Sequence, residues 1–193
     1  MSQSTLTLGR ADQGIELSHE EFAKASFDEP WRYERVQGRL AVMSPAGYDH
    51  HSHVERICKF LYRYNDKHPG VVEHVFTEAW FRIDEDTDRI PDIGVFLVSK
   101  SSSGRLPNRV PELVVEVVSP ESGDHRRDYV EKRLDYERAG VKEYVIVDRF
   151  EPRVTVLRSV GGRFEEHVLA TGEIYATPLL PGLQIPLLAF FDE

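Results

Sequence analysis

Apolar and polar positions follow two rhythms along this chain, and each rhythm predicts one type of element. Apolar residues spaced three and four apart predict helices over residues 17–25, 50–67 and 126–139. Ser18 and Glu21 form a capping-box pattern at the first helix, and Pro69-Gly70 and Gly140 are stop signals for the other two. Alternating or β-branched runs predict strands over 31–43 (a hairpin turning at Gln37-Gly38), 71–76, 79–83, 93–98, 112–118, 143–148, and a second hairpin of 154–158 with 164–169.

The order of the central elements predicts the fold class. Residues 93–98, 112–118, 126–139 and 143–148 follow one another as strand, strand, helix and strand, which indicates a mixed sheet with a crossover helix. The run 112–118, between Pro111 and Pro120, is typical of a central strand buried on both faces. We therefore expect an α/β or α+β fold, a mixed β-sheet core flanked by helices with an N-terminal hairpin and helix. The pattern does not separate the two labels.

The rest of the chain shows no internal repeat and no long linker. We expect residues 1–14 to form a flexible tail and residues 15–193 to form a single domain. The end of the chain, 178–191, is apolar and rich in turn residues. An exposed apolar edge at residues 187–191 would suit a subunit interface, so we expect a homodimer.

Two carboxylates lie where the predicted sheet makes them unusual. Asp92 follows Pro91 at the start of a strand, where a carboxylate would project from the end of the sheet, although an ordinary turn aspartate is the alternative. Glu116 lies inside Leu113-Val114-Val115-Glu116-Val117-Val118. An ionised carboxylate in a buried strand requires compensation, either by a metal ion or by a basic partner.

The next helix supplies a basic partner. Asp128, Lys132 and Tyr136 are spaced i, i+4 and i+8, so they share one face, although Asp128 and Lys132 could equally form a surface ion pair. Asp92 and Glu116, with the backbone carbonyl of Val117, have the hard oxygens that Mg²⁺ prefers, and Mn²⁺ is the alternative ion. Such an ion activates water for phosphodiester cleavage, and Lys132 would position the water or counter the developing charge.

At these residues the sequence resembles the Uma-two family, restriction-endonuclease-like bacterial proteins of the PD-(D/E)XK nuclease superfamily. The resemblance covers roughly residues 15–190. It is carried by Trp31-Arg32-Tyr33-Glu34, Gly38-Arg39-Leu40, His50, Arg89-Ile90-Pro91-Asp92-Ile93, Pro111 to Pro120, Asp128, Lys132, Tyr136, Ala139 to Tyr144, Val147-Asp148 and Leu180-Pro181-Gly182-Leu183.

The resemblance implies roles for several residues. It implies that Asp92 and Glu116 are metal ligands, and that Glu34 is an additional acidic residue that binds a second metal or orients water. A surface hairpin glutamate is the alternative for Glu34. The superfamily places its lysine two residues after the glutamate, where this chain has Val118, so the lysine role passes to Lys132 on the following helix.

Other polar clusters carry weaker signals. His50, His51 and His53 lack the companion ligands of a zinc site, and a solvated helix start explains them better, with His50 as a supporting residue near the cleft. The loop with Lys100, Arg105 and Arg109 could contact phosphates, although an ordinary solvated loop explains it as well. The chain has neither a phosphate-binding Gly-rich loop ending in Gly-Lys-Ser/Thr nor a Gly-x-Ser-x-Gly elbow.

Composition narrows the class of protein further. The single cysteine, Cys58, has core spacing and permits no internal disulfide, and no apolar run approaches the ~20 residues of a membrane helix, so we expect a cytoplasmic protein outside the membrane. The net charge of −9 argues against a protein that coats nucleic acid, but it does not exclude a local basic groove. We therefore expect a Mg²⁺-dependent endonuclease acting on DNA. The alternatives are a nuclease for RNA and a non-catalytic binding or regulatory protein on a nuclease scaffold.

Overall fold

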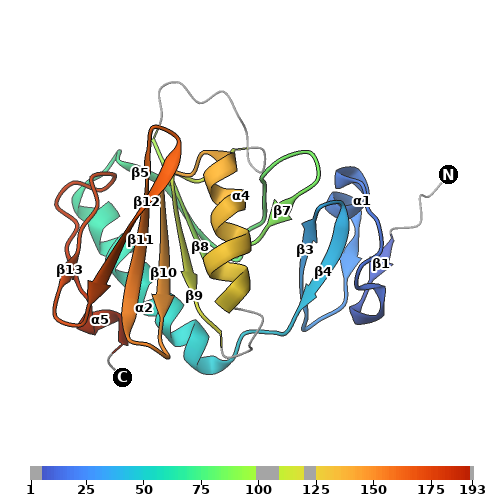
Figure 1. Cartoon of the computed structure of the whole chain (residues 1–193), viewed down its shortest axis with the longest axis horizontal. Coiled ribbons are helices and arrows are strands. Elements are labelled where there is room, and N and C mark those ends of the chain that lie inside the picture. Colours follow the sequence, from blue (N-terminus) through green and yellow to red (C-terminus); the bar gives the residue numbers. More distant parts are fainter. Residues whose placement is uncertain (1–5, 99–108, 120–124, 192–193) are drawn as a thin grey trace.

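The computed structural model describes residues 6–98, 109–119 and 125–191, and two β-sheets organise it (Figure 1). We call the six-stranded sheet the large sheet; its strand order is β12-β11-β10-β9-β8-β5. Its strands are β5 (Val72–Thr77), β8 (Ile93–Leu97), β9 (Leu113–Val117), β10 (Glu143–Asp148), β11 (Arg153–Val160) and β12 (Arg163–Ala170). The four-stranded small sheet has the order β4-β3-β7-β6, formed by β3 (Arg32–Val36), β4 (Arg39–Met43), β6 (Phe81–Arg82) and β7 (Asp88–Arg89).

The large sheet is mixed, as the sequence predicts. Strands β8 and β9 are antiparallel, whereas β9 and β10 are parallel. The parallel pair requires a crossover, which is made by a short π-helical segment, η2 (Arg127–Glu131), running directly into α4 (Lys132–Ala139). Gly140 ends α4 in the left-handed conformation with φ 83°. The expected strand–strand–helix–strand order is confirmed, and the fold is α+β.

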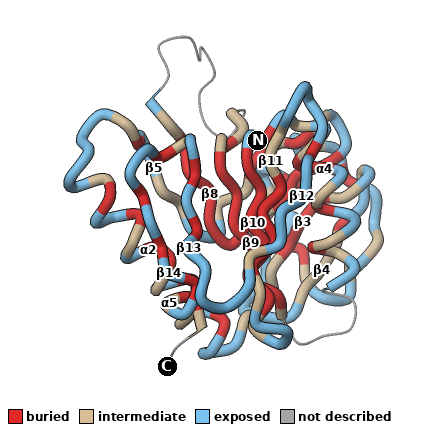
Figure 2. Tube along the Cα trace, turned by 60° about the vertical axis from the view of Figure 1, so that its left-hand side comes forward, coloured by how far each residue is buried: buried red, intermediate tan, exposed pale blue. Residues whose placement is uncertain are grey.

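Helices cover the large sheet on its two faces. The 20-residue helix α2 (Tyr48–Lys67) packs against one face through Val54, Ile57, Cys58 and Leu61. Alternate residues of β9 point to opposite faces of the large sheet. Val115 and the β9 residues that face the same way pack in the core between the sheet and α2, which we call the α2 core. Val114 and Val118 pack in the core between the sheet and α4. Strands β8, β9 and β10 form the buried centre in Figure 2. Glu116 therefore points to the α4 side of the sheet.

The small sheet lies to one side of the large one, and α4 lies between them in the view of Figure 1. The β3–β4 hairpin turns at Gln37-Gly38, both with positive φ, as the hairpin pattern predicts. Helix α1 (His19–Lys24) packs on this sheet through Phe22, and Ser18 caps it by accepting a hydrogen bond from the Glu21 N–H.

The predicted loose tail is wrong for residues 6–14. Strand β1 (Thr7–Leu8) pairs with β2 (Ser26–Phe27), and a turn of 3₁₀ helix, η1 (Arg10–Asp12), follows it. Leu8 is 1% exposed because it packs with Phe22 in the core of the small sheet. Residues 1–5 lie outside the described residues.

Two further predictions need correction. The predicted strand 79–83 is only Phe81–Arg82, and it belongs to the small sheet because it pairs with β7. The apolar segment 187–191 is exposed only in part: Leu188 is 48% exposed, whereas Leu187 and Phe190 are buried in the α2 core. The segment forms α5 (Leu188–Phe191) beside the β13–β14 pair (Ile174–Tyr175 and Ile185–Pro186). Homodimerisation stays a prediction, without that support.

Cys58 is buried in the α2 core, where burial raises the pKa of its thiol to about 11.

Within the described ranges, no helix is both long and apolar enough to span a membrane.

Candidate active site

The register of two antiparallel strands brings the two predicted carboxylates together. Ile93 pairs with Val115, so Asp92, one residue earlier, lies opposite Glu116. The Asp92 N–H lies 3.4 Å from Glu116 Oε2, and the Val117 N–H donates to Asp92 Oδ2 at 2.8 Å. Each carboxylate residue is only 2% exposed. The turn-aspartate alternative for Asp92 is therefore excluded.

Helix α4 and the π-helical segment before it present three polar side chains to Glu116. Lys132 Nζ lies 2.7 Å from Glu116 Oε1 and 3.5 Å from Asp128 Oδ1. The Tyr136 hydroxyl donates to the same Glu116 oxygen at 2.7 Å. The i, i+4, i+8 face predicted from the sequence is confirmed, and the Asp128–Lys132 pair is buried, not on the surface. The Tyr144 hydroxyl donates to the Asp128 backbone carbonyl at 2.9 Å, which ties the π-helical turn to β10.

The Oδ1 atom of Asp92 contacts residues of two further elements, β3 and α2. Arg32 on β3 donates to Asp92 Oδ1 at 3.1 Å, and His50 Nε2 lies 3.0 Å from the same oxygen. His50 Nδ1 in turn lies 3.2 Å from Ser119 Oγ. A supporting place for His50 was predicted from the sequence, whereas no site role was predicted for Arg32 or Ser119. Both lie in segments that carry the family resemblance. Ser119 follows the Glu116 strand directly, and Arg32 reaches Asp92 through the packing of the small sheet.

Neighbouring groups and burial shift the pKa values of Asp92 and Glu116 in opposite directions. Burial opposes the charged form of Asp92, but His50, Arg32 and Lys132 outweigh it and hold the pKa of Asp92 well below its usual range. Burial raises the pKa of Glu116 to about 7; Lys132 opposes the shift, whereas the charges of Asp92 and Asp128 add to it. Burial also works against the Lys132 ammonium, but Glu116, Asp128 and Glu34 raise its pKa overall, so Lys132 stays cationic.

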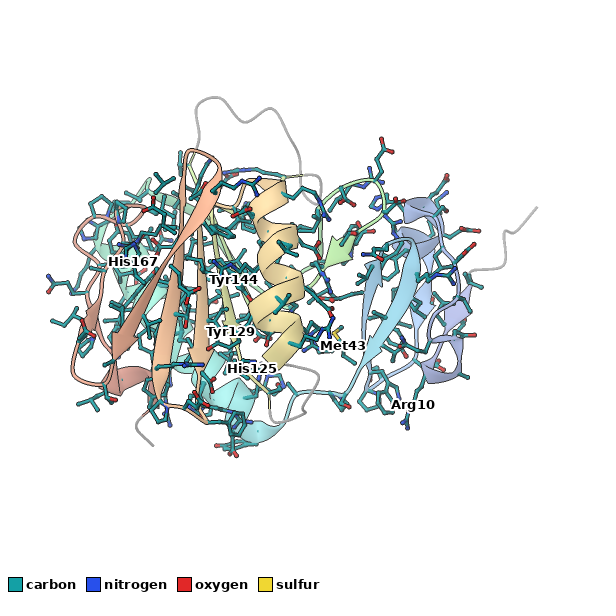
Figure 3. All side chains as sticks on the ribbon, viewed as in Figure 1. Arg10, Met43, His125, Tyr129, Tyr144 and His167 are labelled. Atoms are coloured by element: carbon teal, nitrogen blue, oxygen red, sulfur yellow. The ribbon has the colours of Figure 1, made fainter. Side chains whose placement is uncertain are left out.

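These residues lie around one cavity of about 780 Å³. Asp92, Glu116 and Lys132 line it from the large-sheet side, and residues of the small sheet and the start of α2 complete its walls. Arg10 and Met43 are two of the small-sheet-side residues, and Met43 lies between α4 and the small sheet (Figure 3). The cavity therefore forms where the two sheets meet.

Glu34 occupies neither of its two predicted places. It is 0% exposed, so the surface-glutamate alternative is wrong, and it does not line the cavity. Its carboxylate accepts from Arg89 at 2.7 Å and from the Ile90 N–H at 2.9 Å. Burial alone would raise the pKa of Glu34, but Arg89, Lys132 and the Ile90 N–H lower it to about 2. Glu34 thus holds the segment before Asp92, because Ile90 precedes Asp92 by two residues.

Of the three predicted phosphate-contacting residues, only Arg109 lies within the described residues. Its guanidinium pairs with Glu73 and Glu112 and donates to the Leu97 carbonyl, and it does not line the cavity. The structure therefore gives Arg109 a structural role at the end of β8. Lys100 and Arg105 lie outside the described residues.

The donor set around Asp92 and Glu116 fits a hard divalent ion. Among the residues that the structure describes, no three His, Cys, Asp or Glu side chains converge as a ready-made metal centre. Mg²⁺ does not require one, because it is usually held by one or two carboxylates and several waters. Burial is the main cause of the raised pKa of Glu116, and the charges of Asp92 and Asp128 add to it; a divalent cation beside Glu116 would act against both.

A mixed sheet that carries two facing carboxylates and a helix-borne lysine defines this chain as an α+β protein of restriction-endonuclease-like fold. The crystal structure of a "putative nuclease belonging to DUF820" from Anabaena variabilis superposes with a TM-score of 0.74 at 18% identity, covering 91% of this chain and 98% of that one. The family model described as "Putative restriction endonuclease" matches residues 19–188, and the chain belongs to this family, Uma2. No curated protein matches the chain.

Proposed function

We propose that this protein is a divalent-metal-dependent endonuclease that hydrolyses phosphodiester bonds of DNA. The observation that carries the proposal is the convergence of Asp92, Glu116 and Lys132 on one cavity, with Lys132 Nζ 2.7 Å from Glu116 Oε1. The family description supports the choice of DNA, since restriction endonucleases act on DNA.

In this proposal Asp92 and Glu116 hold Mg²⁺ or Mn²⁺, with the Val117 backbone carbonyl as a further ligand. When bound, the ion would make a nearby water more acidic and stabilise negative charge on the phosphoryl oxygens. The Lys132 ammonium counters the charge that develops as the water oxygen bonds to phosphorus and the bond to the leaving strand breaks. Hydrolysis yields one strand end with a phosphate and one with a hydroxyl.

The surrounding side chains keep these three groups in position. The Tyr136 hydroxyl fixes one oxygen of Glu116, and Asp128 holds Lys132 from the same helical face. Arg32 and His50 orient Asp92 by contacting its Oδ1 atom. Such fixed geometry is what electrostatic catalysis requires, because the donors need not reorganise during the reaction.

The test uses two nearly isosteric variants, Asp92→Asn and Glu116→Gln. We expect the purified protein to cut DNA with Mg²⁺ or Mn²⁺, to stop when EDTA is added, and to lose at least about 100-fold in rate in either variant. Glu112→Gln is the matched control, because Glu112 lies beside the same strand, pairs with Arg109 and does not line the cavity. Circular dichroism checks that each variant folds.

Binding separates this proposal from the non-catalytic alternative. Calorimetric titration with Mn²⁺ should show binding to the unaltered protein and to Glu112→Gln, and weaker binding to the two site variants. Absence of both Mn²⁺ binding and metal-stimulated cleavage of any DNA would contradict the proposal and favour a binding or regulatory protein on this scaffold.

A further inference from the structure

The groups proposed to act on the substrate lie at the bottom of a cavity. Asp92, Glu116 and Lys132 are each 2% exposed, so a phosphodiester must enter the cavity to touch them. The cavity volume of about 780 Å³ is in the range of pockets that take small molecules of one or two nucleotides in size. Enzymes whose reactive groups lie in a pocket too narrow for a duplex take a single strand or an extruded nucleotide.

Aromatic side chains stand on the walls of this cavity. Trp31, just before β3, lines it on the small-sheet side, and the Arg10 guanidinium lies 4.6 Å from the centre of the Trp31 ring. Tyr48, the first residue of α2, lines it on another side and is 87% exposed. Among the described residues, no other large apolar or aromatic side chain is as exposed as Tyr48. An exposed ring such as that of Tyr48 stacks on unpaired bases, whatever their sequence. Trp31 is half-buried, and its ring with the Arg10 guanidinium over it forms part of the cavity wall.

The charge of the cavity also suits a short stretch of strand. The cavity has five basic lining residues, Arg10, Arg32, Arg127, Lys132 and Arg149, and five acidic ones, Asp49, Asp92, Glu116, Asp128 and Glu131. The chain as a whole has a net charge of −9. The cavity is thus a local neutral region of an acidic protein. Proteins that follow a long duplex or a long single strand present extended basic surfaces that contact several phosphates, so this cavity suits contact with only one or two phosphates.

We propose that the cavity takes an unpaired strand, either single-stranded DNA or a frayed end, with bases stacked on Trp31 and Tyr48. This inference rests on the proposed nuclease function and names its substrate class. In this arrangement the aromatic walls hold the bases, while the phosphate between them reaches the buried carboxylates and Lys132. A continuous duplex remains outside because its bases stay stacked on one another.

The first experiment compares cleavage of three DNAs of one sequence: a single strand, a blunt duplex and a splayed fork. We expect the single strand and the unpaired arms of the fork to be cut at least about 10-fold faster than the duplex. Equal or faster cleavage of the blunt duplex would overturn the inference while leaving the nuclease proposal standing. If none of the DNAs is cut, the nuclease proposal fails. The binding of single-stranded DNA, measured as follows, then tests whether the cavity takes an unpaired strand.

Binding is measured in EDTA by the fluorescence anisotropy of a labelled single-stranded oligonucleotide. Tyr48→Ala and Trp31→Ala should each weaken binding roughly 5- to 150-fold, as expected for loss of one stacked base. Trp31→Phe should restore most of the affinity. Tyr62→Ala is the matched control, since Tyr62 is also an exposed tyrosine of α2 but does not line this cavity. Unchanged affinity in Tyr48→Ala and Trp31→Ala would overturn the inference.

A spectroscopic measurement tests stacking directly. The chain has two tryptophans, so Trp80→Phe leaves Trp31 as the sole indole. A saturating unlabelled single strand should quench the Trp31 emission in this variant, and a duplex of the same sequence should quench it much less. Emission that does not change on saturation, in a variant shown to be folded, would contradict stacking on Trp31.

Discussion

The two sheets of this molecule are held together by different forces. The centre of the large sheet is packed on both faces by extensive clusters of buried aliphatic and aromatic side chains. The small sheet and its helix share a separate core of five buried apolar residues, while Phe81 of β6 packs into the core between the large sheet and α4. The five are Leu8, Leu17, Phe22, Tyr33 and Leu40. The small sheet compensates with buried ion pairs, Arg35 with Asp88 at 2.7 Å and Arg89 with Glu34 at 2.7 Å.

The difference teaches how the site is assembled. Apolar packing is non-directional and defines the layers of the large sheet, whereas ion pairs fix orientation. Arg89 on β7 reaches Glu34 on β3 and Asp135 on α4, so a single guanidinium joins the small sheet to the helix that carries Lys132. The position of the small sheet in turn sets Arg32 against Asp92.

The largest expected effect comes from removing that guanidinium. Arg89→Met leaves Glu34 buried without its cation and leaves Asp135 with Arg138 alone. It should lower the free energy of unfolding by about 3–5 kcal/mol, measured by urea denaturation. Leu61→Ala, in the α2 core, should cost a comparable ~2–5 kcal/mol through a cavity. A loss below about 1 kcal/mol in Arg89→Met would show that the small sheet does not depend on its ion pairs.

The second prediction compares how Lys132, on α4, and Arg32, on the small sheet, affect the rate of DNA cleavage. Lys132→Met should lower the rate of DNA cleavage by roughly 100- to 1000-fold, because it removes the charge nearest the phosphate. Arg32→Met should cost less, about 10-fold, because Arg32 acts through Asp92. Single-turnover cleavage measures both, with Lys142→Met, an exposed lysine, as control. A larger loss in Arg32→Met than in Lys132→Met would reverse the assignment of roles.

The third effect is a pH dependence of stability due to Glu34. The pKa of Glu34 is lowered from 4.5 to about 2 in the folded state, so its contribution is present above pH 4.5 and is lost as the pH falls toward 2. This difference between the two pKa values corresponds to roughly 3 kcal/mol in the free energy of unfolding. Urea unfolding between pH 2.5 and 6 should show this slope, and Glu34→Gln should flatten it. Glu165→Gln, at an exposed carboxylate of β12, should leave the slope unchanged.

The smallest effect is local to the small sheet. Ser18→Ala removes the side-chain oxygen that accepts the Glu21 N–H and should destabilise by about 1 kcal/mol. Ser18→Asp, which retains an acceptor, should keep most of the stability. If Ser18→Ala were neutral in thermal unfolding, the cap would be irrelevant to the small sheet.

Much of the large sheet was predictable because its residues carry periodic signals. The run from Leu113 to Val118, interrupted by Glu116, indicated both a central strand and a costly carboxylate, and the structure has β9 and a buried Glu116 there. The helical spacing of Asp128, Lys132 and Tyr136 indicated their common face. The convergence of Asp92, Glu116 and Lys132 is observed, and their catalytic roles stay predictions.

The small sheet and its contribution to the site were harder to predict. Glu34 looked like a surface or metal-binding glutamate, because a single acidic residue in a hairpin does not reveal a partner 55 positions away. Arg32, Ser119 and Trp31 lie in segments that carry the family resemblance, but the local pattern did not predict that they line the cavity.

By itself the sequence determined the elements of the large sheet, the crossover helix and the two carboxylates that lie opposite each other across β8 and β9. These predictions depend on hydrophobic periodicity and on the cost of burying a charge, and a few neighbouring residues are enough to show both. Only the tertiary structure decided that Glu34 serves Arg89, that residues 6–14 are ordered, and that Arg32 and Trp31 face the cavity. Those outcomes depend on how two sheets dock, and docking is set by contacts between residues far apart in the chain.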